Sequence, residues 1–193
     1  YDPHAYERIG RPASMGWQHR GVSYWEDDES DDARIFIALQ DLRLVALNAY
    51  TGALYPDFGH GGFVDLSLGL GREINPVRVT HTSPVAIARD VIVVGSIVQD
   101  TELTLREASP GHVRGFDART GEMKWIFHTI PQGDELAVET WENESWRYSG
   151  HSNVWGTMAV DDELGFVYLP TGTPTNDYYG GMRRGDNLFA ESI

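Results

Sequence analysis

Six residues of this 193-residue chain carry groups that could bind a charged or planar ligand. An arginine guanidinium binds carboxylates bidentately, oxygen ligands suit hard cations, and the face of an indole ring is a platform for a planar molecule. By type alone each also has an ordinary structural explanation, such as a surface arginine, a loop carboxylate or a core tryptophan. Because the six lie far apart in the sequence, they act together only if the fold gathers them. They are Arg20, Thr82, Asp100, Asn153, Trp155 and Thr173.

The composition argues against several other kinds of site. The chain has no cysteine, which excludes disulfides and thiolate metal sites, and its histidines lack the spacing of a zinc motif. A net charge of −14 argues against binding to nucleic acid or to anionic lipid, because both need clustered lysine and arginine. The longest apolar stretch, residues 91–98, is interrupted by Gly95 and Ser96 and is too short to span a membrane. We expect an acidic, solvated surface and no nucleic-acid partner.

Two segments with one shared pattern indicate the elements that position these residues. Residues 46–52 and 115–121 share an apolar residue, Asn or Asp, Ala, any residue, Thr and Gly, and their final glycines are 69 residues apart. Each segment follows one strand-like run and precedes another. We interpret both as structural turns, in which the Asx side chain and the glycine form the turn and the threonine hydroxyl caps it. A repeated strand–turn–strand unit predicts an array of small sheets.

The rest of the chain also has the pattern of short strands, and no stretch has a convincing helical period. Residues 1–18, 129–150 and 171–187 are expected to be loops. The glycine-rich residues 58–71 could hold one helical turn at 63–70. Strand-like runs cover residues 22–25, 35–39, 42–48, 82–88, 91–96, 113–117, 122–128, 154–160 and 166–170, and a further one begins at 53–55.

These runs predict an all-β chain of four-stranded antiparallel blades around an axis, a β-propeller. In this interpretation residues 1–193 form one partial propeller domain of about two to three blades. A closed propeller needs more residues, so we expect a fragment that is truncated at both ends.

The ordered set of motifs resembles the dehydrogenases that depend on pyrroloquinoline quinone (PQQ), and within them the glucose and quinate type. The resemblance covers essentially the whole chain and implies part of an eight-bladed quinoprotein propeller. The turn motif alone is shared with other propellers, whereas the ordered set is specific. Its members are Arg20-Gly21-Val22-Ser23-Tyr24-Trp25, residues 46–52, Asp57-Phe58-Gly59, Val64-Asp65-Leu66, Thr82-Ser83-Pro84, Val93-Val94-Gly95-Ser96, residues 113–121 and Val167-Tyr168-Leu169-Pro170-Thr171-Gly172.

The resemblance assigns cofactor contacts to four of the six residues. Arg20 corresponds to an arginine that lies against the carboxylates and carbonyls of the quinone. Thr82 corresponds to a threonine that hydrogen-bonds the cofactor, and Asn153 to a further contact. Trp155 corresponds to the floor on which the flat quinone stacks.

The other two residues are implied to lie beside a divalent cation. Asp100 corresponds to an acidic or amide ligand of a Ca²⁺ or Mg²⁺ ion next to PQQ, a role that Gln99 could share. Thr173 corresponds to a position that supplies an oxygen near this ion. No catalytic residue is expected within the chain, because the family's catalytic aspartate corresponds to a segment beyond Ile193.

For the complete enzyme, the resemblance implies oxidation of a sugar or cyclic alcohol by hydride transfer to PQQ. The aspartate takes the hydroxyl proton, the cation polarises a quinone carbonyl, and the electrons pass to ubiquinone or a cytochrome. It also implies a periplasmic location, either soluble or membrane-associated through a segment outside this chain. We expect the isolated chain to be inactive.

A non-catalytic propeller that serves as a binding scaffold is the alternative, because such a protein would share only the turn motif. The two hypotheses differ in where the chemistry-bearing residues lie. In the enzyme they meet near one end of the propeller axis, and in the scaffold they scatter. A relative that oxidises small alcohols is a third possibility, although the glycine-rich residues 58–71 favour the glucose and quinate type.

Overall fold

The computed structural model describes residues 1–11, 16–99 and 105–193. This described part consists mainly of short antiparallel strands, arranged in two four-stranded and two two-stranded sheets. None of its helices is long and apolar enough to cross a membrane. The helical segments are α1 (Ala5–Ile9) and the 3₁₀ turns η1 (Val138–Thr140), η2 (Glu142–Arg147) and η3 (Gly180–Met182).

The first four-stranded sheet has the order β1-β2-β3-β4. Side chains alternate between its two faces, as strand geometry requires, so that Phe36 and Ala38 of β2 are buried while Ile37 between them is half-buried. Phe36 lies opposite Ala46 of β3, and both face the core. The strands are β1 (Ser23–Glu26), β2 (Ala33–Ala38), β3 (Arg43–Asn48) and β4 (Phe63–Asp65).

The second four-stranded sheet has the order β10-β9-β7-β6. Its apolar face packs against the first sheet through one core cluster that includes Phe36, Leu44, Phe58, Ile92 and Phe116. Burial of these large side chains holds the two sheets together, because no strand is shared between them. The strands are β6 (Ala86–Ala88), β7 (Val91–Val94), β9 (Val113–Asp117) and β10 (Met123–Phe127).

A hairpin and a small accessory sheet complete the structure. The hairpin pairs β11 (Ala159–Asp161) with β12 (Phe166–Tyr168) and packs on the second sheet through a smaller cluster that contains Val93 and Val154. The accessory sheet pairs β5 (Val79–Thr80) with β8 (Ile97–Val98). β5 leads directly into the Thr82 segment.

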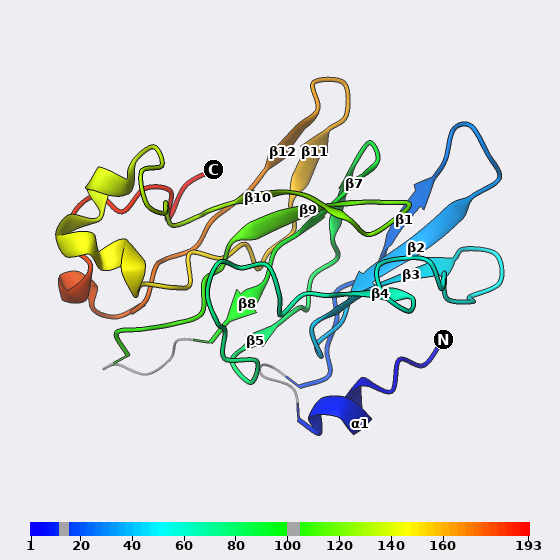
Figure 1. Cartoon of the computed structure of the whole chain (residues 1–193), viewed down its shortest axis with the longest axis horizontal. Coiled ribbons are helices and arrows are strands. Elements are labelled where there is room, and N and C mark those ends of the chain that lie inside the picture. The colour runs from blue at the N-terminus through cyan, green and yellow to red at the C-terminus, as the bar shows by residue number, and fades with distance from the viewer. Residues whose placement is uncertain (12–15, 100–104) are drawn as a thin grey trace.

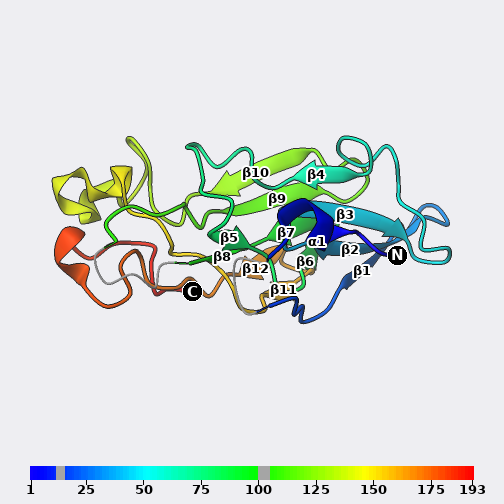
Figure 2. The same cartoon turned by 90° about the horizontal axis from the view of Figure 1, so that it is seen from below.

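The two four-stranded sheets and the β11–β12 hairpin are arranged as neighbouring blades. β6 contacts both β1 and β11, so the first strands of the three units lie side by side. They run along one side of the molecule and the last strands, β4 and β10, along the other (Figure 2). This arrangement confirms the predicted partial β-propeller.

The hairpin tips of the three blades project in the same direction (Figure 1). Exposed acidic side chains lie at two of these tips: Asp28, Glu29 and Asp31 between β1 and β2, and Asp162 and Glu163 between β11 and β12. The opposite ends of β1, β6 and β11, where each strand begins, therefore also share one side of the molecule.

The two repeated turns have the predicted structure. In the first, Asn48 Oδ1 accepts from the backbone N–H of Thr51 at 2.9 Å, and in the second, Asp117 Oδ1 accepts from that of Thr120 at 2.9 Å. Each threonine hydroxyl accepts a further backbone N–H two residues on. The final glycines have φ values of 71° and 75°, a region that L side chains rarely adopt.

These two glycines differ in their surroundings, which gives a stability prediction. A Cβ on Gly52 would meet no atom within 4 Å, whereas a Cβ on Gly121 would lie 2.8 Å from Val64 Cγ2 and 2.9 Å from the backbone N of Gly59. We expect Gly52→Ala to lower the free energy of unfolding by about 1 kcal/mol through backbone strain alone. Gly121→Ala should cost about 2–3 kcal/mol, because overpacking adds to the strain. Equal losses in urea unfolding would contradict this prediction.

The strand that was predicted to begin at residues 53–55 is not formed. Leu54 makes an isolated bridge to Leu47, and the backbone N–H of Tyr55 donates to the carbonyl of Ala46 at 3.2 Å, after which the pairing with β3 ends. The chain then turns through residues 59–62, where three glycines have positive φ, and returns as β4. The helical turn predicted within residues 63–70 is not formed at its start, because residues 63–65 form β4.

Other elements also differ from the sequence-based expectation: β5 and β8 were not predicted, and the strand predicted over 82–88 is reduced to β6. α1 lies within residues 1–18, which were expected to be loop, and its five residues are too few to show a helical period. The strand predicted over 154–160 is reduced to β11. The pairing of this hairpin is interrupted at residues 154–158 and resumes before them, where the carbonyl of Asn153 accepts from the backbone N–H of Gly172 at 3.0 Å.

Candidate functional site

Three of the predicted cofactor residues occupy equivalent places in successive blades. Arg20 lies three residues before β1, Thr82 four residues before β6, and Trp155 four residues before β11. Since these strands are neighbours and start on the same side of the molecule, one residue from each blade lies in the same region. The repeat of the fold thus gathers residues that are far apart in the sequence.

Arg20 and Thr82 are joined by two hydrogen bonds. The backbone N–H of Arg20 donates to the carbonyl of Thr82 at 2.8 Å, and Arg20 Nη1 donates to Thr82 Oγ1 at 2.5 Å. The guanidinium carbon lies 5.7 Å from the centroid of the Trp155 ring, within the range of a cation–π interaction. Arg20 itself is exposed. The structure therefore brings Arg20, Thr82 and Trp155 into one cluster with a positive charge that faces solvent.

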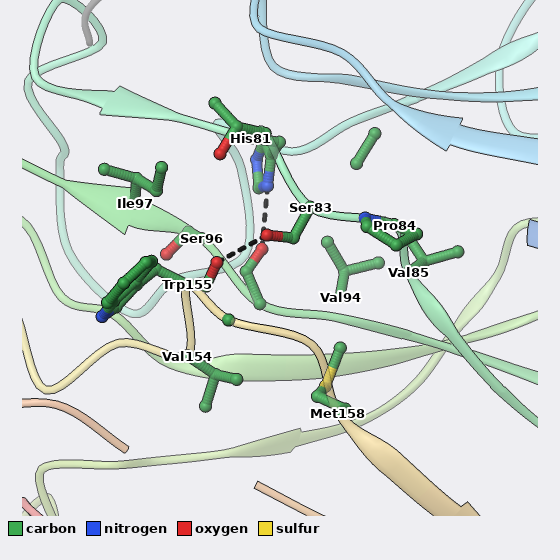
Figure 3. Close-up of a pocket in the computed structure, with 14 residues that line it drawn as sticks. His81, Ser83, Pro84, Val85, Val94, Ser96, Ile97, Val154, Trp155 and Met158 are labelled. Carbon is green, nitrogen blue, oxygen red and sulfur yellow. Dashed lines mark hydrogen bonds between the residues drawn. The ribbon is translucent and has the colours of Figure 1, made fainter. Parts of the chain in front are cut away.

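Ser83 completes this cluster, and the sequence analysis gave it no role. Its hydroxyl accepts from Arg20 Nη1 at 3.2 Å. It also donates to the backbone carbonyl of Trp155 at 2.6 Å (Figure 3). Ser83 thus connects the first and third blades through the second. In the sequence, only its position directly after Thr82 indicated that Ser83 could belong to the site.

Trp155 presents its ring to solvent and is not a core tryptophan. It is 53% exposed, whereas Val154 before it is buried. The pocket beneath its backbone, lined by Thr82, Ser83 and Ser96, encloses about 10 Å³, which is no more than the space of one water molecule. A planar ligand therefore has room on the open face of the indole and not beneath it.

Asn153 lies in the interior and supports the Trp155 segment. It is 1% exposed, and its Nδ2 donates to the carbonyl of Ser96 at 2.5 Å. Its Oδ1 is buried and has no hydrogen-bond partner among the described residues. The backbone carbonyl of Asn153 is held by Gly172. The Asn153 side chain thus connects the segment before Trp155 to Ser96, and its Oδ1 makes no hydrogen bond among the described residues.

The predicted cation site is not assembled in the described part of the chain. The hydroxyl of Thr173 donates to Glu191 Oε1 at 2.7 Å, and its carbonyl accepts from the backbone N–H of Ser152 and from His151 Nδ1. Asp100 lies outside the described residues. Within them, no group of three or more His, Asp or Glu residues is arranged to hold a metal ion. The roles of Asp100 and Thr173 stay predictions.

The donor set fits a planar anion. Arg20 uses Nη1 for Thr82 and Ser83, and a guanidinium has five N–H donors, so the group keeps capacity for a carboxylate. The hydroxyls of Thr82 and Ser83 lie beside it, and the exposed Trp155 ring offers a flat apolar surface. The cluster can bind a ring with acidic substituents by stacking and by charge-assisted hydrogen bonds.

Comparisons with known proteins agree with this geometry. The family model described as the glucose, ethanol and alcohol dehydrogenase β-propeller domain, PQQ, matches residues 1–193. The glycerol dehydrogenase large subunit of Gluconobacter oxydans (strain 621H) is 36% identical over 183 residues, which cover 92% of this chain and 23% of that protein. The quinoprotein glucose dehydrogenase of Escherichia coli (strain K12) is 34% identical over 184 residues, which cover 90% and 22%.

The fold is also similar to a solved structure. The quinohemoprotein alcohol dehydrogenase ADHIIG from Pseudomonas putida HK5 aligns with a TM-score of 0.73 and 25% identity over 98% of this chain and 26% of that one. The chain therefore spans about a quarter of the length of the relatives that it matches. With the family model matched along its whole length, the chain belongs to the β-propeller domain family of the PQQ-dependent glucose, ethanol and alcohol dehydrogenases.

Proposed function

We propose that this chain is the part of a PQQ-dependent dehydrogenase that holds one side of the cofactor. The single observation that carries the proposal is the meeting of Arg20, Thr82 and Trp155 at the start of three neighbouring strands. In the complete protein we propose that a hydroxyl of a sugar or cyclic alcohol is oxidised. This class of substrate is supported by a relative named for glucose and by one named quinate/shikimate dehydrogenase (quinone).

The residues of this chain bind and orient. Arg20 would hold carboxylate or carbonyl oxygens of the cofactor, with Thr82 and Ser83 fixing the guanidinium by their hydroxyls. Trp155 would supply the stacking surface, and its own position is fixed by the bond from Ser83 to its carbonyl. PQQ, when bound, supplies the two-electron redox chemistry. The proposal also includes a Ca²⁺ or Mg²⁺ ion, which Asp100 and Thr173 would hold. No reaction step is assigned to this ion.

The electron acceptor and the location of the protein are further parts of the proposal. One relative is named as a quinone-linked enzyme and another as methanol dehydrogenase [cytochrome c] subunit 1. These names support ubiquinone or a cytochrome as the acceptor. A periplasmic location rests on the family resemblance alone.

A cofactor titration tests the proposal. We expect the full-length protein to bind PQQ and Trp155→Leu to bind it about tenfold more weakly, because aromatic stacking contributes about 0.5–1.5 kcal/mol beyond buried area. Quenching of tryptophan fluorescence gives the dissociation constant. Trp146→Leu, in the 3₁₀ turn Glu142–Arg147 away from the cluster, is the control and should leave it unchanged.

The same titration distinguishes the alternative function. A folded, full-length protein that does not bind PQQ would favour a non-catalytic scaffold. The convergence of Arg20, Thr82 and Trp155 argues against that alternative, because a scaffold that shares only the turn motif has no reason to gather them.

A further inference from the structure

His81 is a buried histidine that the proposed cofactor contacts do not use. It lies between β5 and Thr82, and its side chain is 3% exposed. With Ser83 and Ser96 it lines the small pocket beneath the backbone of Trp155 (Figure 3). Burying an imidazole removes its two ring nitrogens from water, which costs free energy unless the ring makes a useful interaction.

The ring makes one hydrogen bond among the described residues. Nδ1 lies 2.8 Å from the carbonyl oxygen of Gly95. Because a carbonyl only accepts, Nδ1 carries the proton, and Nε2 of the neutral ring is an acceptor. Nε2 is buried without a partner in the described part of the chain. Burial, with a smaller effect of Arg114, lowers the pKa of His81 to about 3, so the ring is neutral near pH 7.

Gly95 links this hydrogen bond to the Trp155 segment. A Cβ on Gly95 would overlap the carbonyl oxygen of Val154 and lie 3.1 Å from Val154 Cβ, so the two backbones are in close contact. The imidazole fixes the Gly95 peptide, and that peptide supports the residue before Trp155. On its other side His81 is covalently joined to Thr82. One buried side chain thus connects Thr82 to Trp155 from beneath the cluster.

We propose that His81 is a positioning residue that fixes the spacing between Thr82 and the ring of Trp155. The role rests on the proposed function, because this spacing matters only when one ligand contacts both residues. A ring that stacks on Trp155 and hydrogen-bonds Thr82 must meet both at once, and a binding constellation loosened by about 1 Å loses function. The hydrogen bond to Gly95 holds Thr82 and Trp155 at this spacing. The free-energy cost is that Nε2 is buried without a partner among the described residues.

Two amide substitutions separate the donor at Nδ1 from the polarity of the ring. The Nδ2 of asparagine can take the place of Nδ1, whereas the longer glutamine carries its amide near the place of Nε2. We expect H81N to bind PQQ within about threefold of the unmodified protein and H81Q to bind it at least tenfold more weakly. Both are measured in the full-length protein by the fluorescence titration, after the melting temperature has shown that each variant is folded.

A second measurement tests whether His81 acts through Thr82. Thr82→Val in the unmodified and H81Q backgrounds should weaken PQQ binding less than additively, because both changes disturb the same contact. The positioning role is overturned if H81Q binds as well as the unmodified protein, if H81N is as weak as H81Q, or if the two losses add fully. If the unmodified protein does not bind PQQ, the proposed function fails as well. If it binds and the His81 variants do not differ, only the positioning role is lost.

Discussion

Replacing Arg20 with methionine is expected to weaken PQQ binding by about 100-fold or more. Hydrogen bonds to charged groups contribute about 1.5–3 kcal/mol each, and a guanidinium makes two of them to one carboxylate. Two such bonds amount to about 3–6 kcal/mol, where 1.4 kcal/mol corresponds to a factor of ten in affinity. Methionine keeps an unbranched apolar chain that can still pack beside Trp155. Equilibrium titration of the full-length protein with PQQ measures the loss.

A matched arginine provides the control. Arg89 lies in the turn between β6 and β7, at the far end of the same set of strands, where its side chain donates to the carbonyls of Asp162 and Glu163. Arg89→Met should change PQQ affinity by less than about twofold, since it removes the same charge far from the cluster. The loss of PQQ affinity in Arg20→Lys should lie between those of Arg89→Met and Arg20→Met, because an ammonium keeps the charge but not the planar geometry of the guanidinium. Similar losses for Arg20→Met and Arg89→Met would show that overall charge, and not the place of Arg20, governs binding.

The second large effect is expected from Gly95→Ala, which acts on the site through the backbone. The added Cβ would overlap the carbonyl oxygen of Val154, and backbone atoms cannot move aside as a flexible side chain does. We expect the free energy of unfolding to fall by about 1–3 kcal/mol from overpacking. We also expect PQQ affinity to fall by about tenfold, because the Trp155 ring is displaced with its segment. Urea unfolding and the cofactor titration measure the two effects.

Gly156→Ala is the control for this substitution. Gly156 follows Trp155 directly, yet a Cβ there would meet no atom within 4 Å. Its effect on unfolding should stay within about 0.5 kcal/mol, and PQQ affinity should be unchanged. A Gly95→Ala variant that is as stable and binds as tightly as Gly156→Ala would show that the Val154 segment adapts freely.

The fold could be predicted from the sequence where local chemistry decides it. In the two Asx-Ala-x-Thr-Gly turns, the Asx side chain accepts from the backbone N–H of the threonine in the same turn, so the pattern alone identifies them. β4 could not be found in this way, because its pairing with β3 depends on a glycine-rich turn whose path is set by tertiary packing. The same is true at β11, because the predicted strand is interrupted at residues 154–158 and its pairing resumes only between Asn153 and Gly172.

The candidate site was predicted only in part, for a related reason. Arg20, Thr82 and Trp155 were found through the ordered motifs, and the structure brings them together. Ser83 and His81 were missed, because a serine or a histidine gains such a role only from the atoms it meets in space. The metal roles of Thr173 and Asp100 stay predictions, since the hydroxyl of Thr173 is occupied by Glu191 and Asp100 lies outside the described residues.

The common direction of the hairpin tips gives the molecule two ends of different electrostatic character. The tips between β1 and β2 and between β11 and β12 carry exposed Asp and Glu side chains and the tip between β6 and β7 carries Arg89, whereas Arg20 precedes the start of β1 at the opposite end. We expect the carboxylates at the two acidic tips to repel an approaching anion and Arg20 at the opposite end to attract it, so that charge helps orient the encounter before any contact forms. An acidic surface, which by itself disfavours anionic ligands, would thereby favour approach from the end that carries Arg20.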